Sequence, residues 1–161
     1  MRASSKRYCL TPQGEFYLIG YGPRYESRKK PAEGVHDDIY ARAVLLEVDG
    51  EEIFLFNADY IEFEEWSCNE IKKMMAAAYG IGENRVLLSA THDHHSVMSY
   101  HKHWNTGVFS QEYYDFFVDT VKKSYEECRA SLTECEMYFG KGMVEGCYGS
   151  PIYYGQPADN E

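Results

Sequence analysis

The chain has 161 residues, 44% hydrophobic and 16% aromatic, which suffices for one domain with a buried core and excludes a disordered or collagen-like protein. Its 16 basic and 26 acidic residues give a net charge of −10, which disfavours nucleic acid because an acidic surface repels phosphates. No apolar run reaches the ~18 residues of a membrane-spanning helix, and no signal segment is visible. We therefore expect a cytoplasmic protein whose five cysteines are reduced.

The first half of the chain predicts strands. Residues 16–21 form a short apolar run before a Gly-Pro turn, and the polar stretch 25–34 predicts a surface loop. Residues 42–48 and 52–56 are rich in leucine and β-branched side chains, and the Asp-Gly pair between them is typical of a hairpin. Both segments are apolar on both faces, which indicates a sheet covered by helices.

The second half alternates helices with strands. The apolar residues of 63–79 share one stripe, which predicts a helix, and 85–90 predicts a second buried strand. A further helix should begin after Ser110, and 135–139 should form a last strand. The apolar face of that helix contains Tyr113, Phe116, Phe117, Val121 and Cys128. We expect an α/β fold, with a mixed β-sheet covered by helices.

The last residues of the chain contain no completed element. We therefore expect residues 1–161 to form a single domain that is truncated at its C-terminal end, the alternative being a frayed terminus.

Histidines cluster directly after the strand predicted at 85–90. Five of the six histidines lie between positions 92 and 103. His92 and His94 would face the same side of an extended segment, where two imidazoles can converge on one metal ion at about 2.0–2.1 Å. Asp93 would face the other way, either behind the metal ligands or toward solvent. The position favours a site because α/β sheets bind ligands beyond the carboxyl ends of their strands; the alternative is a solvated pair.

Known histidine motifs do not account for this cluster. A metallo-β-lactamase needs His-x-His-x-Asp-His, and this chain has Ser96 and Val97 at the last two places. An amidohydrolase barrel needs about 200 residues or more. The chain contains no His-Glu-x-x-His, P-loop or nucleophile-elbow pattern.

Four segments together resemble one family. They are residues 10–12 with 18–22 (LIGYG), 34–43 (GVHDDIYARA), the hairpin end 57–59 and residues 87–94 (LLSATHDH). In order and spacing over residues 9–96 they are similar to the N-terminal catalytic domain of the neutral/alkaline non-lysosomal ceramidase family. The family has Ser-Gly-Pro where this chain has His95, Ser96 and Val97.

The resemblance implies a zinc-dependent amidase that hydrolyses ceramide, or a related N-acyl amide, to an amine and a fatty acid. It implies that His92 is a zinc ligand and that His94, in the same site, contacts substrate or stabilises charge. The family's remaining ligands, a second histidine, a glutamate and a tyrosine, would lie in a missing C-terminal part of the same protein.

Other residues of the matching segments are candidates for the same site. Asp59 follows a buried strand beside His92 and is a catalytic candidate that could orient an imidazole. His36, Asp37 and His95 are candidates for substrate binding, although Asp37 could instead cap local backbone. Arg42 is expected to form a buried ion pair with an acidic residue. The alternative function is a non-catalytic ceramidase-like module that binds metal, lipid or a partner protein.

Overall fold

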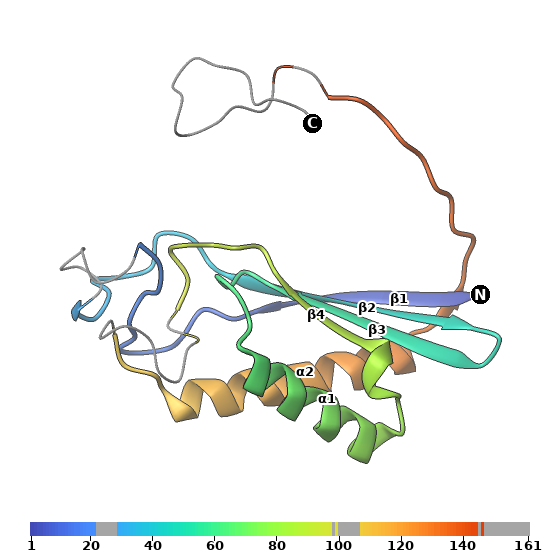
Figure 1. The fold of residues 1–161 in the computed structure, drawn as a ribbon, viewed down its shortest axis with the longest axis horizontal. Helices are drawn as coiled ribbons and strands as arrows, with labels where there is room; N and C mark the ends of the chain where they lie inside the picture. Colours follow the sequence, from blue (N-terminus) through green and yellow to red (C-terminus); the bar gives the residue numbers. More distant parts are fainter. Residues whose placement is uncertain (22–28, 98, 100–106, 145, 147–161) are drawn as a thin grey trace.

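The computed structural model describes residues 1–21, 29–97, 99, 107–144 and 146. Within them a five-stranded sheet lies against two long helices (Figure 1). The strands are β1 (Arg2–Cys9), β2 (Tyr40–Val48), β3 (Glu51–Ala58), β4 (Val86–Ala90) and β5 (Thr133–Glu134). The helices are α1 (Glu65–Tyr79), the short 3-10 turn η3 (Glu83–Arg85) and α2 (Gln111–Ala130).

The sheet is mixed, with the strand order β4-β3-β2-β1-β5. β2 and β3 form the predicted antiparallel hairpin, and its turn residues Asp49 and Gly50 have φ values of 52° and 83°. Positive φ at both central residues is what a two-residue hairpin turn requires, which explains the Asp-Gly pair. β3 and β4 are parallel, and α1 makes the connection between them. The predicted grouping of these three strands in one sheet is confirmed.

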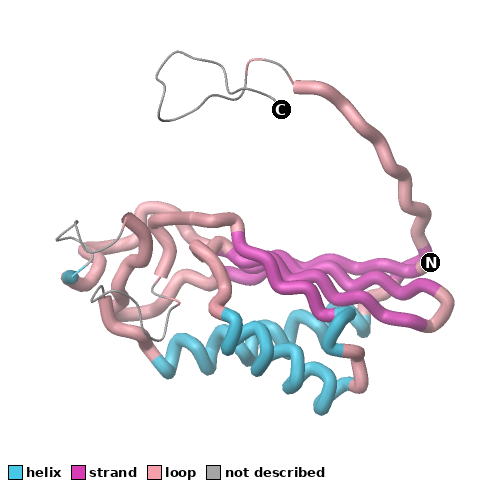
Figure 2. Tube along the Cα trace, viewed as in Figure 1, coloured by secondary structure: helices cyan, strands magenta, loops and turns pink. Residues whose placement is uncertain are grey.

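Both helices cover the same face of the sheet (Figure 2). On that face the rings of Phe54 and Phe56 are buried, and Phe56 packs edge-to-face on Phe117 of α2 at 5.7 Å between ring centroids. On the opposite face Ile53 and Leu87 are 37% and 47% exposed. The sequence analysis expected helices to cover the sheet, because its strands are apolar on both faces. In the described part of the chain the helices cover one face only.

The helix boundaries follow from their capping residues. The first helix was predicted at 63–79, and Gly80 ends it in the left-handed region (φ 73°), with its N–H donating to the Ala76 oxygen. Ser110 caps the second helix, as predicted, by accepting a hydrogen bond from the Tyr113 N–H at 3.1 Å. In the parts that the structure describes, no helix is both long and apolar enough to cross a membrane.

Two strand predictions were wrong, and one strand was missed. β1 was missed because its sequence, RASSKRYC, is polar and lacks apolar alternation; backbone pairing with β2 holds it in the sheet. Residues 16–21 make only isolated bridges, such as that between Leu18 and Val97. The strand β5 ends at Glu134; Cys135 makes one further backbone hydrogen bond, to the Met1 oxygen at 3.2 Å, and Phe139 further along is 97% exposed. Aromatic and β-branched composition therefore did not mark strands where no partner strand was available.

The core predicts a sharp contrast between two neighbouring phenylalanines of α2. Phe117 is 2% exposed and Phe116 is 45% exposed, although the sequence placed both on the apolar face. Phe117→Ala should lower the free energy of unfolding by about 3–5 kcal/mol, because it leaves a cavity among aromatic rings. Phe116→Ala, the matched control, should cost about 1 kcal/mol or less. Equal losses for the two variants, measured by urea denaturation, would contradict this packing.

Candidate functional site

The carboxyl ends of β3 and β4 form the base of the site. Beyond the paired strands, the Thr91 N–H donates to the Ala58 oxygen and the Asp93 N–H donates to the Tyr60 oxygen, each at 3.0 Å. Asp59 therefore lies beside the segment that carries the histidines, at the sheet edge where the sequence placed them both. This juxtaposition was predicted and is confirmed.

The imidazoles of His92 and His94 lie against each other. Their ring centroids are 4.8 Å apart and their Nε2 atoms 3.2 Å apart. The backbone is not extended, as the sequence analysis had assumed. His92 has a φ of 64°, and the Asp93 carboxylate accepts the His95 N–H at 2.8 Å, which fixes a turn. This turn brings the two imidazole rings into contact, and the Asp93 carboxylate stabilises it through the hydrogen bond from the His95 N–H.

Two backbone groups determine which ring nitrogens carry hydrogen. The Ile61 carbonyl oxygen lies 2.8 Å from His92 Nδ1, and a carbonyl can only accept, so the neutral His92 ring carries its hydrogen on Nδ1. The Tyr21 N–H donates to His94 Nδ1 at 3.4 Å, so the neutral His94 ring carries its hydrogen on Nε2. The His94 Nε2–H then donates to His92 Nε2. One ring contributes a lone pair and the other an N–H to the same small region.

Asp59 is bound within the sheet edge and does not orient an imidazole in this structure. Its carboxylate accepts hydrogen bonds from the Arg42 guanidinium at 2.8 Å, the Tyr40 N–H at 2.9 Å and the Thr91 hydroxyl at 3.4 Å. Burial raises the pKa of Asp59, but the hydrogen bonds from Arg42 and Tyr40 outweigh it, and the pKa lies below its usual value. The ion pair predicted for Arg42 is present, although this side chain is about half exposed rather than buried.

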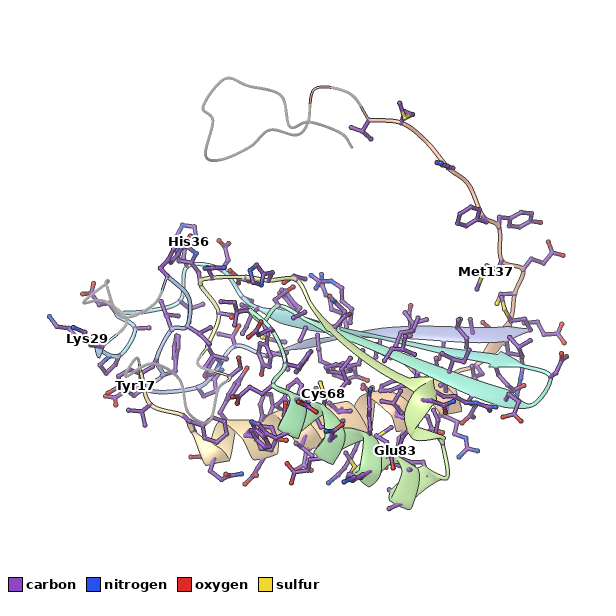
Figure 3. The ribbon with its side chains drawn as sticks, viewed as in Figure 1. Tyr17, Lys29, His36, Cys68, Glu83 and Met137 are labelled. Atoms are coloured by element: carbon purple, nitrogen blue, oxygen red, sulfur yellow. The ribbon has the colours of Figure 1, made fainter. Side chains whose placement is uncertain are left out.

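The residues predicted to bind substrate line one cavity of about 490 Å³. His36, Asp37, Asp59, Asp93 and His95 all contribute to its wall. His36 Nδ1 and the Asp37 carboxylate are 2.6 Å apart, and both side chains are more than four-fifths exposed, so this pair forms the outer rim. His36 lies in the loops beyond the strand ends (Figure 3). His92 and His94 do not line this cavity. Asp93, which lies between them in the sequence, does line it, so the histidine pair lies next to the cavity.

A second cavity, of about 480 Å³, adjoins the first and shares Thr11, Pro12, Phe16 and Val97 with it. Its other walls come from Gln13, Glu15 and Tyr17, from residues 108–110 and from the first turns of α2. The sequence analysis missed this cavity because its walls come from segments about 90 residues apart, and their pairing depends on the tertiary fold. It also missed Ile61 and Tyr21, since each acts through a backbone group that its side chain does not reveal.

The donor set was tested for its fit to a metal ion. The 3.2 Å between the two Nε2 atoms is the length of the hydrogen bond that His94 donates to His92, so the pair offers one metal donor, the Nε2 lone pair of His92. The carbonyl behind His92 is the partner that metal-binding histidines usually have. The described residues contain no group of three or more histidine, cysteine or carboxylate side chains that could hold a metal. They thus fit part of a metal site.

The chain is thus a mixed α/β domain with polar side chains beyond its strand ends, the edge at which α/β sheets bind their ligands. Residues 8–152 match the N-terminal part of the neutral/alkaline non-lysosomal ceramidase family, and the chain belongs to this family.

The neutral ceramidase of Pseudomonas aeruginosa is a curated relative, 27% identical over 128 residues, which are 74% of this chain and 19% of that protein. The crystal structure of neutral ceramidase from Pseudomonas aeruginosa superposes with a TM-score of 0.68 at 24% identity, covering 81% of this chain and 22% of the other. A structure described as ceramidase complexed with C2 gives a TM-score of 0.67 at 25% identity, with 81% and 21% coverage. The chain therefore spans about a fifth of the length of these relatives.

The Asp59 network predicts a pH-dependent contribution to stability. A carboxyl whose pKa is lowered by folding stabilises the fold above its unfolded pKa of about 3.9, and this contribution disappears as pH falls through the folded value. Asp59→Asn should therefore be less stable than wild type at pH ~7, and the difference should narrow below pH ~4. Asp49→Asn, at the hairpin tip, is the control. A stability difference for Asp59→Asn that is constant from neutral to acid pH in urea denaturation would refute the assignment.

Proposed function

We propose that this chain is the N-terminal part of a zinc-dependent amidase that hydrolyses the N-acyl amide bond of ceramide or a related N-acyl lipid. The facing imidazoles of His92 and His94 carry this proposal, because they offer one lone pair and one N–H beyond the strand ends. Membership of the ceramidase family supports the hydrolase class and a lipid amide as substrate.

The two histidines have different proposed roles. His92, with Nδ1–H held by the Ile61 carbonyl, has its lone pair on Nε2, where it accepts the His94 Nε2–H, and is the residue that would hold zinc in place of that hydrogen bond. When bound, zinc supplies a water of lowered pKa and polarises the amide carbonyl. His94 directs an Nε2–H at the same region, where it can donate to the carbonyl oxygen as negative charge develops on it.

The other candidates have supporting roles in this proposal. Asp59 fixes the ends of β2, β3 and β4 through Arg42, Tyr40 and Thr91, so it acts through the backbone that carries the histidines. His36, Asp37 and His95 line the cavity of about 490 Å³ and would contact the polar part of the substrate. The adjoining cavity has Phe16, Val108, Phe109 and Phe116 in its wall, which is suited to the apolar part of an N-acyl lipid.

A non-catalytic ceramidase-like module remains the second candidate. The observation in its favour is that the described residues bring together fewer than three metal donors, whereas a hydrolytic zinc site has about three protein ligands. Under the amidase proposal, hydrolysis requires a longer protein that carries this chain and supplies further donors. The two candidates therefore differ in the activity of the longest reading frame that contains residues 1–161.

Hydrolysis of a short-chain ceramide by that longer protein tests the proposal. We expect turnover that a chelator abolishes, a loss of at least about 100-fold in His92→Ala, and a fall of about 10²–10³ in kcat for His94→Ala. His94→Gln should recover part of this loss, because its amide N–H can replace the Nε2–H. Residues 1–161 alone should give no turnover.

The control is Cys9→Ser, which removes an exposed thiol outside the site and should retain zinc affinity in calorimetric titration. Zinc binding that is unchanged in His92→Ala would remove this residue from the metal site. Zinc binding without hydrolysis in the longer protein would favour the non-catalytic module.

A further inference from the structure

Residues 18–21, here called the 18–21 arm, run alongside the histidine turn in antiparallel fashion. Leu18 forms a bridge with Val97, and the Ile19 N–H donates to the Ser96 oxygen at 3.0 Å. Ile19 is 1% exposed, so its side chain anchors the arm in the interior. The last contact is the Tyr21 N–H on His94 Nδ1 at 3.4 Å. Successive residues of the arm thus contact the histidine turn, and the last of them, Tyr21, contacts the His94 imidazole.

Gly20 is required in the arm for two independent reasons. Its φ is 105°, a backbone conformation that side chains rarely adopt. A Cβ at this position would lie 2.4 Å from the His94 carbonyl oxygen and 2.8 Å from the His94 Cα. Only a residue without a side chain lets the arm approach the backbone of His94 so closely.

Tyr21 adopts a strained conformation that the core does not explain. Its φ is 59°, which costs a residue with a Cβ about 1–2 kcal/mol. The residue is 48% exposed, so burial contributes little to offset that cost. Its ring packs at 4.9 Å from the His94 ring and 5.3 Å from the His95 ring. The strained conformation therefore places both the N–H and the ring of Tyr21 against the histidine turn.

We propose that Gly20 and Tyr21 are positioning residues that fix the orientation and hydrogen placement of the His94 imidazole. This inference rests on the proposed function only for its catalytic consequence. The Tyr21 N–H makes His94 Nδ1 an acceptor, the Tyr21 ring limits rotation of the imidazole, and Gly20 permits the approach. His94 Nε2–H is thereby directed toward His92 Nε2, the region in which the proposed function needs a donor to the substrate carbonyl.

The direct test replaces residue 21 by the α-hydroxy acid of tyrosine, so that an ester oxygen takes the place of the N–H while the ring stays. Long-range ¹H–¹⁵N spectra of the full 161-residue chain at pH ~8, where histidines are ordinarily neutral, report each imidazole nitrogen. We expect the His94 Nδ1 resonance to shift toward that of an acceptor without a hydrogen bond. His92, held by Ile61, should keep its pattern. An unchanged His94 Nδ1 resonance would overturn the proposal.

A matched pair of glycine variants provides the second test. Gly20→Ala should disturb the same His94 resonance, whereas Gly50→Ala should not. Gly50 also has a positive φ, of 83°, but nothing lies within 4 Å of a Cβ built there. A His94 shift of equal size in both variants would overturn the proposal. If Gly20→Ala does not fold, the ester variant decides.

Activity separates this inference from the proposed function. In the longest reading frame containing the chain, Gly20→Ala should lower kcat about tenfold or more, with KM nearly unchanged, because a small displacement of a reacting group is costly. In a His94→Ala background the same change should cause little further loss; a full additional loss would overturn the inference. If the wild-type protein hydrolyses no amide, the proposed function fails while the imidazole spectra still decide the role of the arm.

Discussion

The parallel pairing of β3 with β4 is the constraint on which the rest of the site depends. An antiparallel partner would have brought the start of one strand to the end of the other. The parallel arrangement, connected through α1, brings both carboxyl ends to one edge. Asp59 and His92 follow those two ends, so their proximity is a consequence of topology. The buried contact between Phe56 and Phe117 holds α2 against the same sheet and keeps that edge in place.

Backbone groups give the two histidines their different properties. A side-chain partner such as a carboxylate or hydroxyl can rotate or titrate, and a hydroxyl can exchange its donor role for that of an acceptor. The Ile61 carbonyl and the Tyr21 N–H have no such freedom, so each fixes one ring without an additional charge. Two chemically identical side chains, two positions apart, therefore present a lone pair and an N–H. The proposed metal ligand and oxyanion donor differ in this way, and the sequence spacing of His92 and His94 alone does not specify the difference.

Local sequence predicted the elements whose formation depends on local chemistry. The Asp-Gly turn, the Ser110 cap and the apolar stripe of 63–79 each act within a few residues, and the corresponding hairpin and helices are present. β1 could not be predicted because its polar sequence becomes a strand only through pairing with β2, about 40 residues away. Residues 136–139 show the converse, since their aromatic composition does not form a strand beyond the end of the backbone pairing at Cys135.

The sequence predicted the site residues that follow strand ends. It could not predict which backbone groups of other segments lie beside the histidines. The histidine cluster, Asp59 and the segment containing His36 were recognisable because chemistry-bearing side chains follow predicted strands. The Ile61 carbonyl and the Tyr21 N–H are present at almost every position of any chain, so nothing in their residue types marks them. Only the fold shows which of these backbone groups lies beside an imidazole.

Two backbone conformations at the site are strained, and the surrounding structure holds them in place. Two residues with side chains have positive φ values there: Tyr21 on the 18–21 arm and His92 on the histidine turn. The two segments meet where the Tyr21 N–H donates to His94 Nδ1. Each strained residue would be expected to relax by about 1–2 kcal/mol if its segment were free. They are held instead by neighbours that are buried or hydrogen-bonded through the backbone. These are Ile19 in the arm, and Thr91 and Asp93, whose N–H groups donate to the Ala58 and Tyr60 oxygens. A rigid scaffold on both sides of the turn is thus what allows a strained and partly exposed pair of histidines to keep one arrangement.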